Sequence, residues 1–182
     1  FGLAKRLQVP DDYFTLSQTI GYQYFDLNNY YTGLFTFGNG VSNNLFYAVA
    51  LSRNNTYTNP IFPVGGSSFT IGAKFSFPYS LVSNIDYGDL ENQPAYQNAD
   101  GSANREKIDQ EKFRWLEYYK LNFEGSWYTR IINKLILRTH AEFGFLGAYN
   151  ADRGIIPFER YYLGGDGLAQ YALDGREMIA LR

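Results

Sequence analysis

The chain has 182 residues, the length of one ordinary domain. Its formal net charge of -2 and its lack of a basic cluster argue against a nucleic-acid partner. It contains no cysteine, which excludes disulfide bonds, thiolate catalysis and cysteine-type zinc sites. Mean hydropathy is -0.33, and no apolar run approaches the roughly 20 residues that a membrane-spanning helix needs. Aromatic residues, however, make up 19% of the chain, which is a high share.

A strict alternation of apolar and polar residues is the clearest pattern along the chain. In the first such segment Ile20, Tyr22 and Tyr24 take one face, and the residues between them are small or polar. A period of two is typical of a β-strand with one apolar and one polar face. The strands are about ten residues long, which suits a bilayer crossing, whereas soluble strands more often have about five or six. We expect five of them, at 14–25, 45–52, 69–77, 119–128 and 135–145.

The connections between these strands alternate between long and short, as in outer-membrane barrels with short periplasmic turns and long external loops. The expected connections are 28–44, 57–66, 79–112, 129–133 and the tail from 148. Aromatic residues near the strand ends are typical of the girdles of such barrels. They are Tyr22, Tyr24, Phe25, Phe77, Tyr79, Tyr118, Tyr119, Trp127 and Tyr128. The sequence therefore predicts an all-β chain that forms part of a transmembrane antiparallel β-barrel; a soluble sandwich or lipocalin-like barrel is the alternative.

Five strands cannot close a membrane barrel, because bacterial examples begin at eight. An open edge in lipid would leave unpaired N–H and C=O groups, at a cost of several kcal/mol each. We therefore expect the missing strands in another part of the same protein or in other chains. The glycine-rich, charged stretch from Pro157, which runs up to Arg182, likewise indicates part of something longer.

Residues that could carry chemistry are few. His140, the only histidine, lies between Arg138 and Glu142 on the polar face of a predicted strand. We interpret these three as a lumen wall in which opposite charges pair across strands, rather than as a proton-transfer cluster. Acidic residues in the connections match no calcium loop, and the glycines at 164–167 lack the features of a phosphate loop. We expect no enzyme activity, no catalytic or metal-binding residue and no cofactor.

Three motifs carry a resemblance to a known family. Phe62-Pro63-Val64-Gly65-Gly66 is similar to an aromatic-Pro-x-x-Gly periplasmic turn, in which Phe62, Pro63 and Gly65 are the key positions. The stretch 157–165 is similar to the start of the sixth external loop, and Leu181-Arg182 matches the first half of that loop's hallmark. The chain thus resembles the barrel of the BamA family, within the outer-membrane assembly factor and surface antigen superfamily. Its long 166–180 insert resembles Bacteroidetes-type members.

The resemblance implies a place for the chain in a larger protein. Residues 1–182 would be the central segment of a barrel of a probable sixteen strands, about strands seven to eleven, and would end within the sixth external loop. That loop would enter the lumen and dock there, with its arginine, Arg182, paired to acidic residues beyond this sequence. The docking residues implied are Pro157, Phe158, Gly164, Gly165, Leu181 and Arg182.

The function implied is the folding and insertion of β-barrel proteins into the bacterial outer membrane, without nucleotide hydrolysis. The partners would be outer-membrane lipids, unfolded outer-membrane protein substrates and the lipoprotein subunits of the assembly machinery, with no nucleic acid. Substrate strands would add at a weak seam by edge pairing. Three alternatives stay open: a transporter of one secreted partner, as in two-partner secretion, a passive porin and a soluble lipid-binding barrel.

Overall fold

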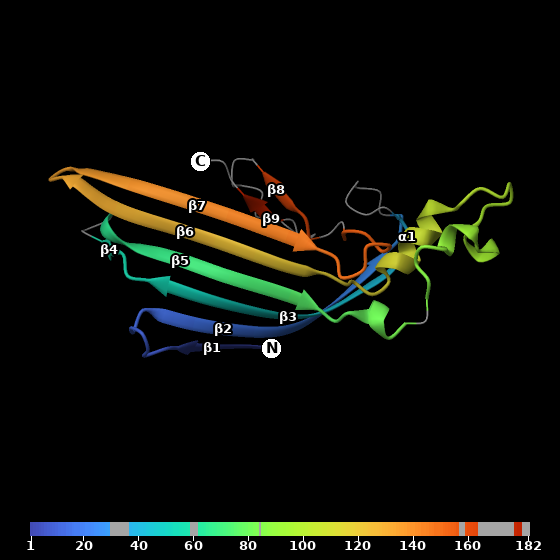
Figure 1. Cartoon of the computed structure of the whole chain (residues 1–182), viewed down its shortest axis with the longest axis horizontal. Helices are drawn as coiled ribbons and strands as arrows, with labels where there is room; N and C mark the ends of the chain where they lie inside the picture. Colours follow the sequence, from blue (N-terminus) through green and yellow to red (C-terminus); the bar gives the residue numbers. More distant parts are fainter. Residues whose placement is uncertain (30–36, 59–61, 84, 157–158, 164–176, 180–182) are drawn as a thin grey trace. The chain divides into compact units, whose positions relative to one another are not determined.

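The computed structural model describes the whole chain except residues 30–36, 59–61, 84, 157–158, 164–176 and 180–182. The fold is all-β, with one six-strand antiparallel sheet and one helix, as the alternating pattern predicts (Figure 1). The strands pair in the order β1-β2-β3-β5-β6-β7, and the short β4 pairs with β5. Their bounds are β1 Gly2–Arg6, β2 Phe14–Leu27, β3 Gly40–Asn54, β4 Tyr57–Thr58, β5 Pro63–Ser76, β6 Tyr119–Ile132 and β7 Leu135–Gly147.

Strand β7 shows how the alternation of apolar and polar residues gives the sheet two different faces. On β7, Leu135, Leu137, Phe143 and Phe145 take one face and are 51–64% exposed. Arg138, His140 and Glu142 occupy the other face. A soluble protein seldom exposes so continuous an apolar surface, whereas a lipid-facing sheet requires one. Among the described residues no helix is long and apolar enough to cross a membrane.

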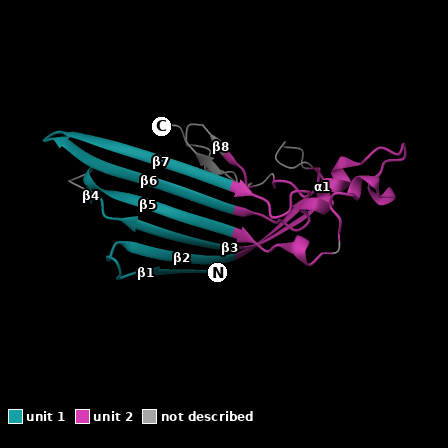
Figure 2. Ribbon diagram, in the orientation of Figure 1, with its two compact units in different colours: residues 1–20, 47–74, 120–145 teal, residues 21–46, 75–119, 146–182 magenta. Residues whose placement is uncertain are grey.

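The chain divides into two compact units, one made of residues 1–20, 47–74 and 120–145 and the other of residues 21–46, 75–119 and 146–182 (Figure 2). The first unit holds strand segments and the turns between them. In it β1 pairs with the start of β2, from Gly2 opposite Thr19 to Arg6 opposite Thr15. The two residues 133–134 join β6 to β7 in a tight hairpin.

The second unit holds the other strand segments and the long connection between β5 and β6. That connection contains three short 3-10 helices, η1 Tyr79–Leu81, η2 Leu90–Asn92 and η3 Pro94–Tyr96, and the α-helix α1 Arg105–Phe113. The Asn104 side chain caps α1 by accepting a hydrogen bond from the backbone N–H of Lys107 at 3.1 Å. Two short parallel strands, β8 Tyr161–Leu163 and β9 Glu177–Ile179, pair near the end of the chain.

Buried apolar side chains in the second unit form two clusters. One combines residues of β2 and of the connections, namely Leu27, Phe37, Phe113, Leu116, Tyr118 and Ile156. The other consists of Tyr87, Leu90 and the α1 residue Ile108. These clusters give the connection between β5 and β6 a folded core, and we call this connection, residues 77–118, the cap.

The structure corrects three details of the sequence prediction. It has six strands in the main sheet, because β1, too short for a clear alternation, pairs with β2. The predicted polar loop 79–112 contains helix α1, which Ile108 and Phe113 anchor to the clusters. The predicted turn 57–66 is shorter, since Tyr57 already faces Gly65 in the β4–β5 pairing.

Candidate functional site

The predicted loop residues Pro157, Phe158, Gly164, Gly165, Leu181 and Arg182 all lie outside the described part of the chain. The predicted turn residues are described. Phe62 lies in a bend and is 73% exposed, while Pro63 and Gly65 belong to β5. The next residue, Gly66, has a φ of +87°, which favours glycine, and a Cβ there would collide with the Asn55 carbonyl oxygen. Gly66 therefore meets a steric need of this turn, whereas the importance of Gly65 stays a prediction.

Glu159, the third residue of the predicted loop motif 157–165, is buried in a series of hydrogen-bonded polar side chains. The phenol Oη of Tyr118 donates a hydrogen bond to Glu159 Oε1 at 3.2 Å. Asn44 Nδ2 donates to the same Oη at 3.2 Å and to Gln23 Oε1 at 2.9 Å. Glu159 is 8% exposed, Asn44 1% and Tyr118 0%. These hydrogen bonds connect Gln23 of β2 and Asn44 of β3, through Tyr118 directly before β6, to Glu159. We call these four side chains the Glu159 anchor.

The electrostatics of the Glu159 anchor favour a neutral phenol. Burial, and secondly the neighbouring Glu159 carboxylate, raise the pKa of Tyr118 far above its ordinary value of 10.0. The phenol therefore keeps its proton and remains a hydrogen-bond donor to a carboxylate at all physiological pH values. Buried polar groups are costly unless they are paired, so this contact fixes the segment at Glu159 against the sheet.

Sequence reasoning missed this anchor. It placed Tyr118 in the exposed aromatic girdle, which is wrong, because the side chain is fully buried. Tyr22, Tyr24, Phe77, Tyr119 and Trp127 are exposed, as the girdle prediction requires. The two anchor residues are 41 positions apart, and no local pattern connects them.

A second buried contact holds the connection after β7. Arg153 Nη1 lies 2.9 Å from Glu117 Oε2, and their side chains are 4% and 1% exposed. The guanidinium also donates to the carbonyl oxygens of Lys112 and Trp115, and Glu117 accepts from the backbone N–H and the hydroxyl of Ser80 at 2.7 Å each. Each charge thus has several partners, which offsets the cost of burying it.

The polar face of β6 and β7 carries the predicted wall cluster. The two ring nitrogens of His140 face different partners, since Nδ1 lies 2.9 Å from Ser126 Oγ and Nε2 lies 3.8 Å from Glu142 Oε2. Arg138 also donates to Ser126 Oγ, at 3.4 Å. The Glu142 distance exceeds a hydrogen bond, so nothing fixes the imidazole as a base for Ser126. The contacts that cross from β7 to β6 reach the neutral Ser126, and His140 and Glu142 lie on the same strand, so the pairing of opposite charges across strands stays a prediction.

Three acidic residues of the connections have partners within the described part of the chain. Asp11 binds Arg53, Asp86 accepts from the backbone N–H of Gly88, and Asp100 accepts from Ser102. Among the described residues no group of three or more acidic, histidine or cysteine side chains could hold a metal ion.

Comparison with known proteins gave one family. The profile of the Omp85 superfamily domain matches residues 1–170. No curated protein and no solved structure matches the chain.

Proposed function

Because this chain belongs to the Omp85 superfamily, we propose that it forms part of the barrel of an outer-membrane assembly factor of the BamA type. Members of the superfamily are outer-membrane β-barrels that insert or transport proteins and are not enzymes. The proposed activity is the folding and insertion of other β-barrel proteins into the bacterial outer membrane. The match over residues 1–170 is the observation that carries the proposal.

The open sheet supports a position inside a larger barrel. β1 and β7 are the outermost strands of the main sheet, so each presents one edge of backbone N–H and C=O groups to further strands. We propose that residues 1–182 are the central segment of that barrel and end within the sixth external loop. Phe62, Pro63 and Gly65 then form a periplasmic turn, and the connection 77–118 faces outward.

The Glu159 anchor supports the proposed docking of the sixth loop. In this proposal Pro157, Phe158, Gly164 and Gly165 begin the loop, and Leu181 and Arg182 carry its hallmark. The Tyr118–Glu159 hydrogen bond of 3.2 Å fixes the segment beside the glycines to the sheet. A guanidinium at Arg182 would add a bidentate contact to a carboxylate on the barrel wall. Two separate attachments would hold the loop in the lumen.

A cell-based replacement tests this function. We expect Arg182→Ala in the full-length protein to lower the outer-membrane levels of several unrelated barrel proteins and to make the loop more sensitive to protease. Arg160→Ala is the matched control, because Arg160 is an exposed arginine on the same segment. Normal barrel levels together with unchanged protease resistance would contradict the role of Arg182. Normal barrel levels after depletion of the whole protein would contradict the function itself.

A transporter of one secreted partner is the second candidate, because the superfamily match applies equally to it. Such proteins carry two periplasmic POTRA domains, so the number of POTRA domains in the complete gene separates the two functions. Depletion separates them as well, because a transporter loses one secreted protein while an assembly factor loses many barrels. The family match argues against a passive porin and a soluble lipid-binding barrel.

A further inference from the structure

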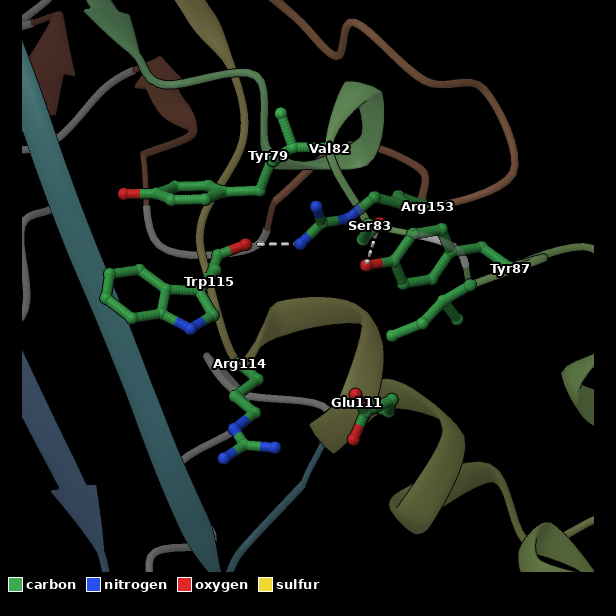
Figure 3. Close-up of a pocket in the computed structure, with 9 residues that line it drawn as sticks. Tyr79, Val82, Ser83, Tyr87, Glu111, Arg114, Trp115 and Arg153 are labelled. Atoms are coloured by element: carbon green, nitrogen blue, oxygen red, sulfur yellow. Dashed lines mark hydrogen bonds between the residues drawn. The ribbon is translucent and has the colours of Figure 1, made fainter.

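A cavity with a volume of about 280 Å³ lies in the second unit, where residues of the cap form most of its lining. Pockets for drug-sized ligands begin near about 300 Å³, so this cavity suits a smaller ligand, such as a single ring with its substituents. Its lining combines aromatic rings with charged side chains, among them Tyr79, Trp115, Glu111 and Arg114 (Figure 3). The ligand that fits must therefore use both kinds of group.

Trp115 supplies an aromatic surface that is open to a ligand. It lines the cavity and is 38% exposed. The Tyr79 ring lies against the indole at a centroid distance of 4.8 Å, and Phe77 packs edge-on against Tyr79 at 5.0 Å. These ring contacts restrict the indole, while part of its surface stays accessible. The negative face of an aromatic ring attracts C–H groups, whose hydrogens carry a partial positive charge.

Two charged side chains lie close to Trp115 in the sequence and line the same cavity. Glu111 belongs to the last turn of α1, and Arg114 directly follows the helix with helical φ and ψ angles of −58° and −39°. Residues three apart in a helix are neighbours on one side of it. No hydrogen bond or ion pair joins either side chain to another residue in the described part of the chain. A carboxylate and a guanidinium are thus available to one ligand.

The remaining charge of the cavity is already committed. The Arg153 guanidinium pairs with Glu117 and lies over the Tyr87 ring, 4.7 Å from its centroid. It also donates to the carbonyl oxygens of Lys112 and Trp115. Arg153 therefore holds the wall of the cavity in place, and the binding groups left are Trp115, Glu111 and Arg114.

This set of groups favours a neutral, hydroxylated ring over a charged ligand. Glu111 repels a ligand that is only anionic, and Arg114 repels one that is only cationic. A zwitterion without a ring would leave the Trp115 surface unused. A hydroxyl group both donates and accepts hydrogen bonds, so a ring with neighbouring hydroxyls can donate to the carboxylate and accept from the guanidinium. Hydrogen bonds to charged groups are stronger than those between neutral groups.

We propose that this cavity binds the pyranose ring of a neutral saccharide. The C–H face of the ring packs on Trp115, and neighbouring hydroxyl groups hydrogen-bond to Glu111 and Arg114. The source of the saccharide rests on the proposed function, which places the cap on the outer side of the membrane. Saccharides reach that side as chains of outer-leaflet glycolipids or as free polysaccharides, and the ring chemistry is the same in both.

The test uses the full-length protein in lauryldimethylamine oxide, a detergent without a sugar headgroup. Saturation-transfer difference NMR measures the binding of the methyl α-pyranosides of glucose, mannose and galactose, each at the same concentration. We expect saturation transfer to the ring C–H protons of at least one pyranoside, and none to sorbitol, which has hydroxyl groups but no ring. Absence of transfer to all the pyranosides, or equal transfer to sorbitol, would overturn the proposal.

Tryptophan variants locate the ring contact in the same assay. Trp115→Leu should lower the transfer at least about fivefold, because the aromatic surface is lost. Trp127→Leu is the matched control, since Trp127 is 39% exposed and belongs to β6 in the first unit. Unchanged transfer in Trp115→Leu, or equal losses in the two variants, would contradict a site at Trp115.

Charge variants test the hydroxyl contacts. Glu111→Gln and Arg114→Gln should each weaken pyranoside binding, because each replaces a charge-assisted hydrogen bond by a neutral one. Glu91→Gln and Arg105→Gln are the controls, since both residues are exposed charges elsewhere in the cap. Losses in these controls as large as in Glu111→Gln and Arg114→Gln would contradict the assigned contacts.

Competition identifies the source of the saccharide. The saccharide chain released by mild acid from the outer-leaflet glycolipid should displace the methyl pyranoside if that glycolipid is the source, and secreted polysaccharide should displace it if free saccharide is the source. Displacement by neither would overturn the assignment to a surface saccharide. Unchanged barrel levels after depletion of the protein would count against the proposed function alone, because pyranoside binding is measured on the purified protein.

Discussion

Arg153 and Glu117 form an ion pair of 2.9 Å whose side chains are 4% and 1% exposed, although 36 residues separate them in the sequence. The pair joins the connection after β7 to the residue two positions before β6. Because both charges are buried, the removal of one leaves the other without compensation in a medium that solvates it poorly. The folded cap therefore depends on both residues together.

The first prediction concerns this pair. Glu117→Gln should destabilise the full-length protein by about 3–5 kcal/mol, because it leaves the Arg153 charge buried. The measurement is urea unfolding in detergent micelles, followed by tryptophan fluorescence. Asp11→Asn removes a partner of Arg53 in a pair with 20% and 33% exposed side chains, and its effect should be much smaller. Equal losses of unfolding free energy in the two variants would show that burial of the ion pair does not determine the destabilisation.

The second prediction concerns the Glu159 anchor. Tyr118→Phe removes the hydroxyl that donates to Glu159 and leaves a buried carboxylate without that donor. The expected cost is about 1–3 kcal/mol, with faster proteolysis of the segment after Ile156. Tyr24→Phe is the control, because Tyr24 is 56% exposed. Unchanged proteolysis in Tyr118→Phe would exclude the hydroxyl as an attachment point.

The third prediction concerns the motif turn. Gly66→Ala places a Cβ against the Asn55 carbonyl oxygen at a φ of +87°, so backbone strain and a collision add together. Gly101→Ala has a similar φ of +81° but no atom within 4 Å of the added Cβ. This variant therefore measures the destabilisation caused by backbone strain alone. We expect about 1–2 kcal/mol of destabilisation for Gly101→Ala and clearly more for Gly66→Ala. Chemical unfolding of both variants measures the difference, and equal losses would be inconsistent with the collision.

The fourth prediction concerns pH. Hydrogen bonds from the Arg53 side chain lower the pKa of Asp11 below its ordinary value of 3.8. A carboxyl whose pKa is lower in the folded state contributes stability above pH 3.8, and this contribution is lost as pH falls through the folded pKa. The wild-type protein should therefore be more stable than Asp11→Asn at neutral pH, and the difference should disappear in acid below pH 3.8. A difference that grows in acid would contradict this linkage. Unfolding curves across the pH range provide the measurement.

The long strands could be predicted from the sequence because a lipid-facing sheet imposes the alternation directly on neighbouring residues. β7 is an example, with Phe143 and Phe145 on one face and Glu142, directly before them, on the other. Helix α1 was missed, since its nine residues carry only two buried side chains, Ile108 and Phe113, and its stability comes from packing with distant segments. The strand β1 was missed because five residues show too little alternation, and its pairing with β2 is a tertiary contact.

The candidate site was only partly predictable, for a related reason. The wall residues Arg138, His140 and Glu142 follow one another on a single strand face, so their clustering is visible in the sequence. The Glu159 anchor and the Arg153–Glu117 pair join positions 41 and 36 residues apart. Neither contact produces a periodic pattern in the sequence, because both form only when segments distant along the chain fold together.

The proposed function is that the complete protein folds and inserts β-barrel proteins into membranes. Reconstitution of the full-length protein with its partner subunits into liposomes tests it most directly. Two unrelated barrel substrates are added in unfolded form without nucleotide, and their folded fraction is followed over time by heat-modifiable gel migration. We expect faster folding of both substrates than in empty liposomes, and slower folding when Arg182→Ala replaces the wild type. Folding no faster than in empty liposomes, with transport of a single secreted partner instead, would contradict it.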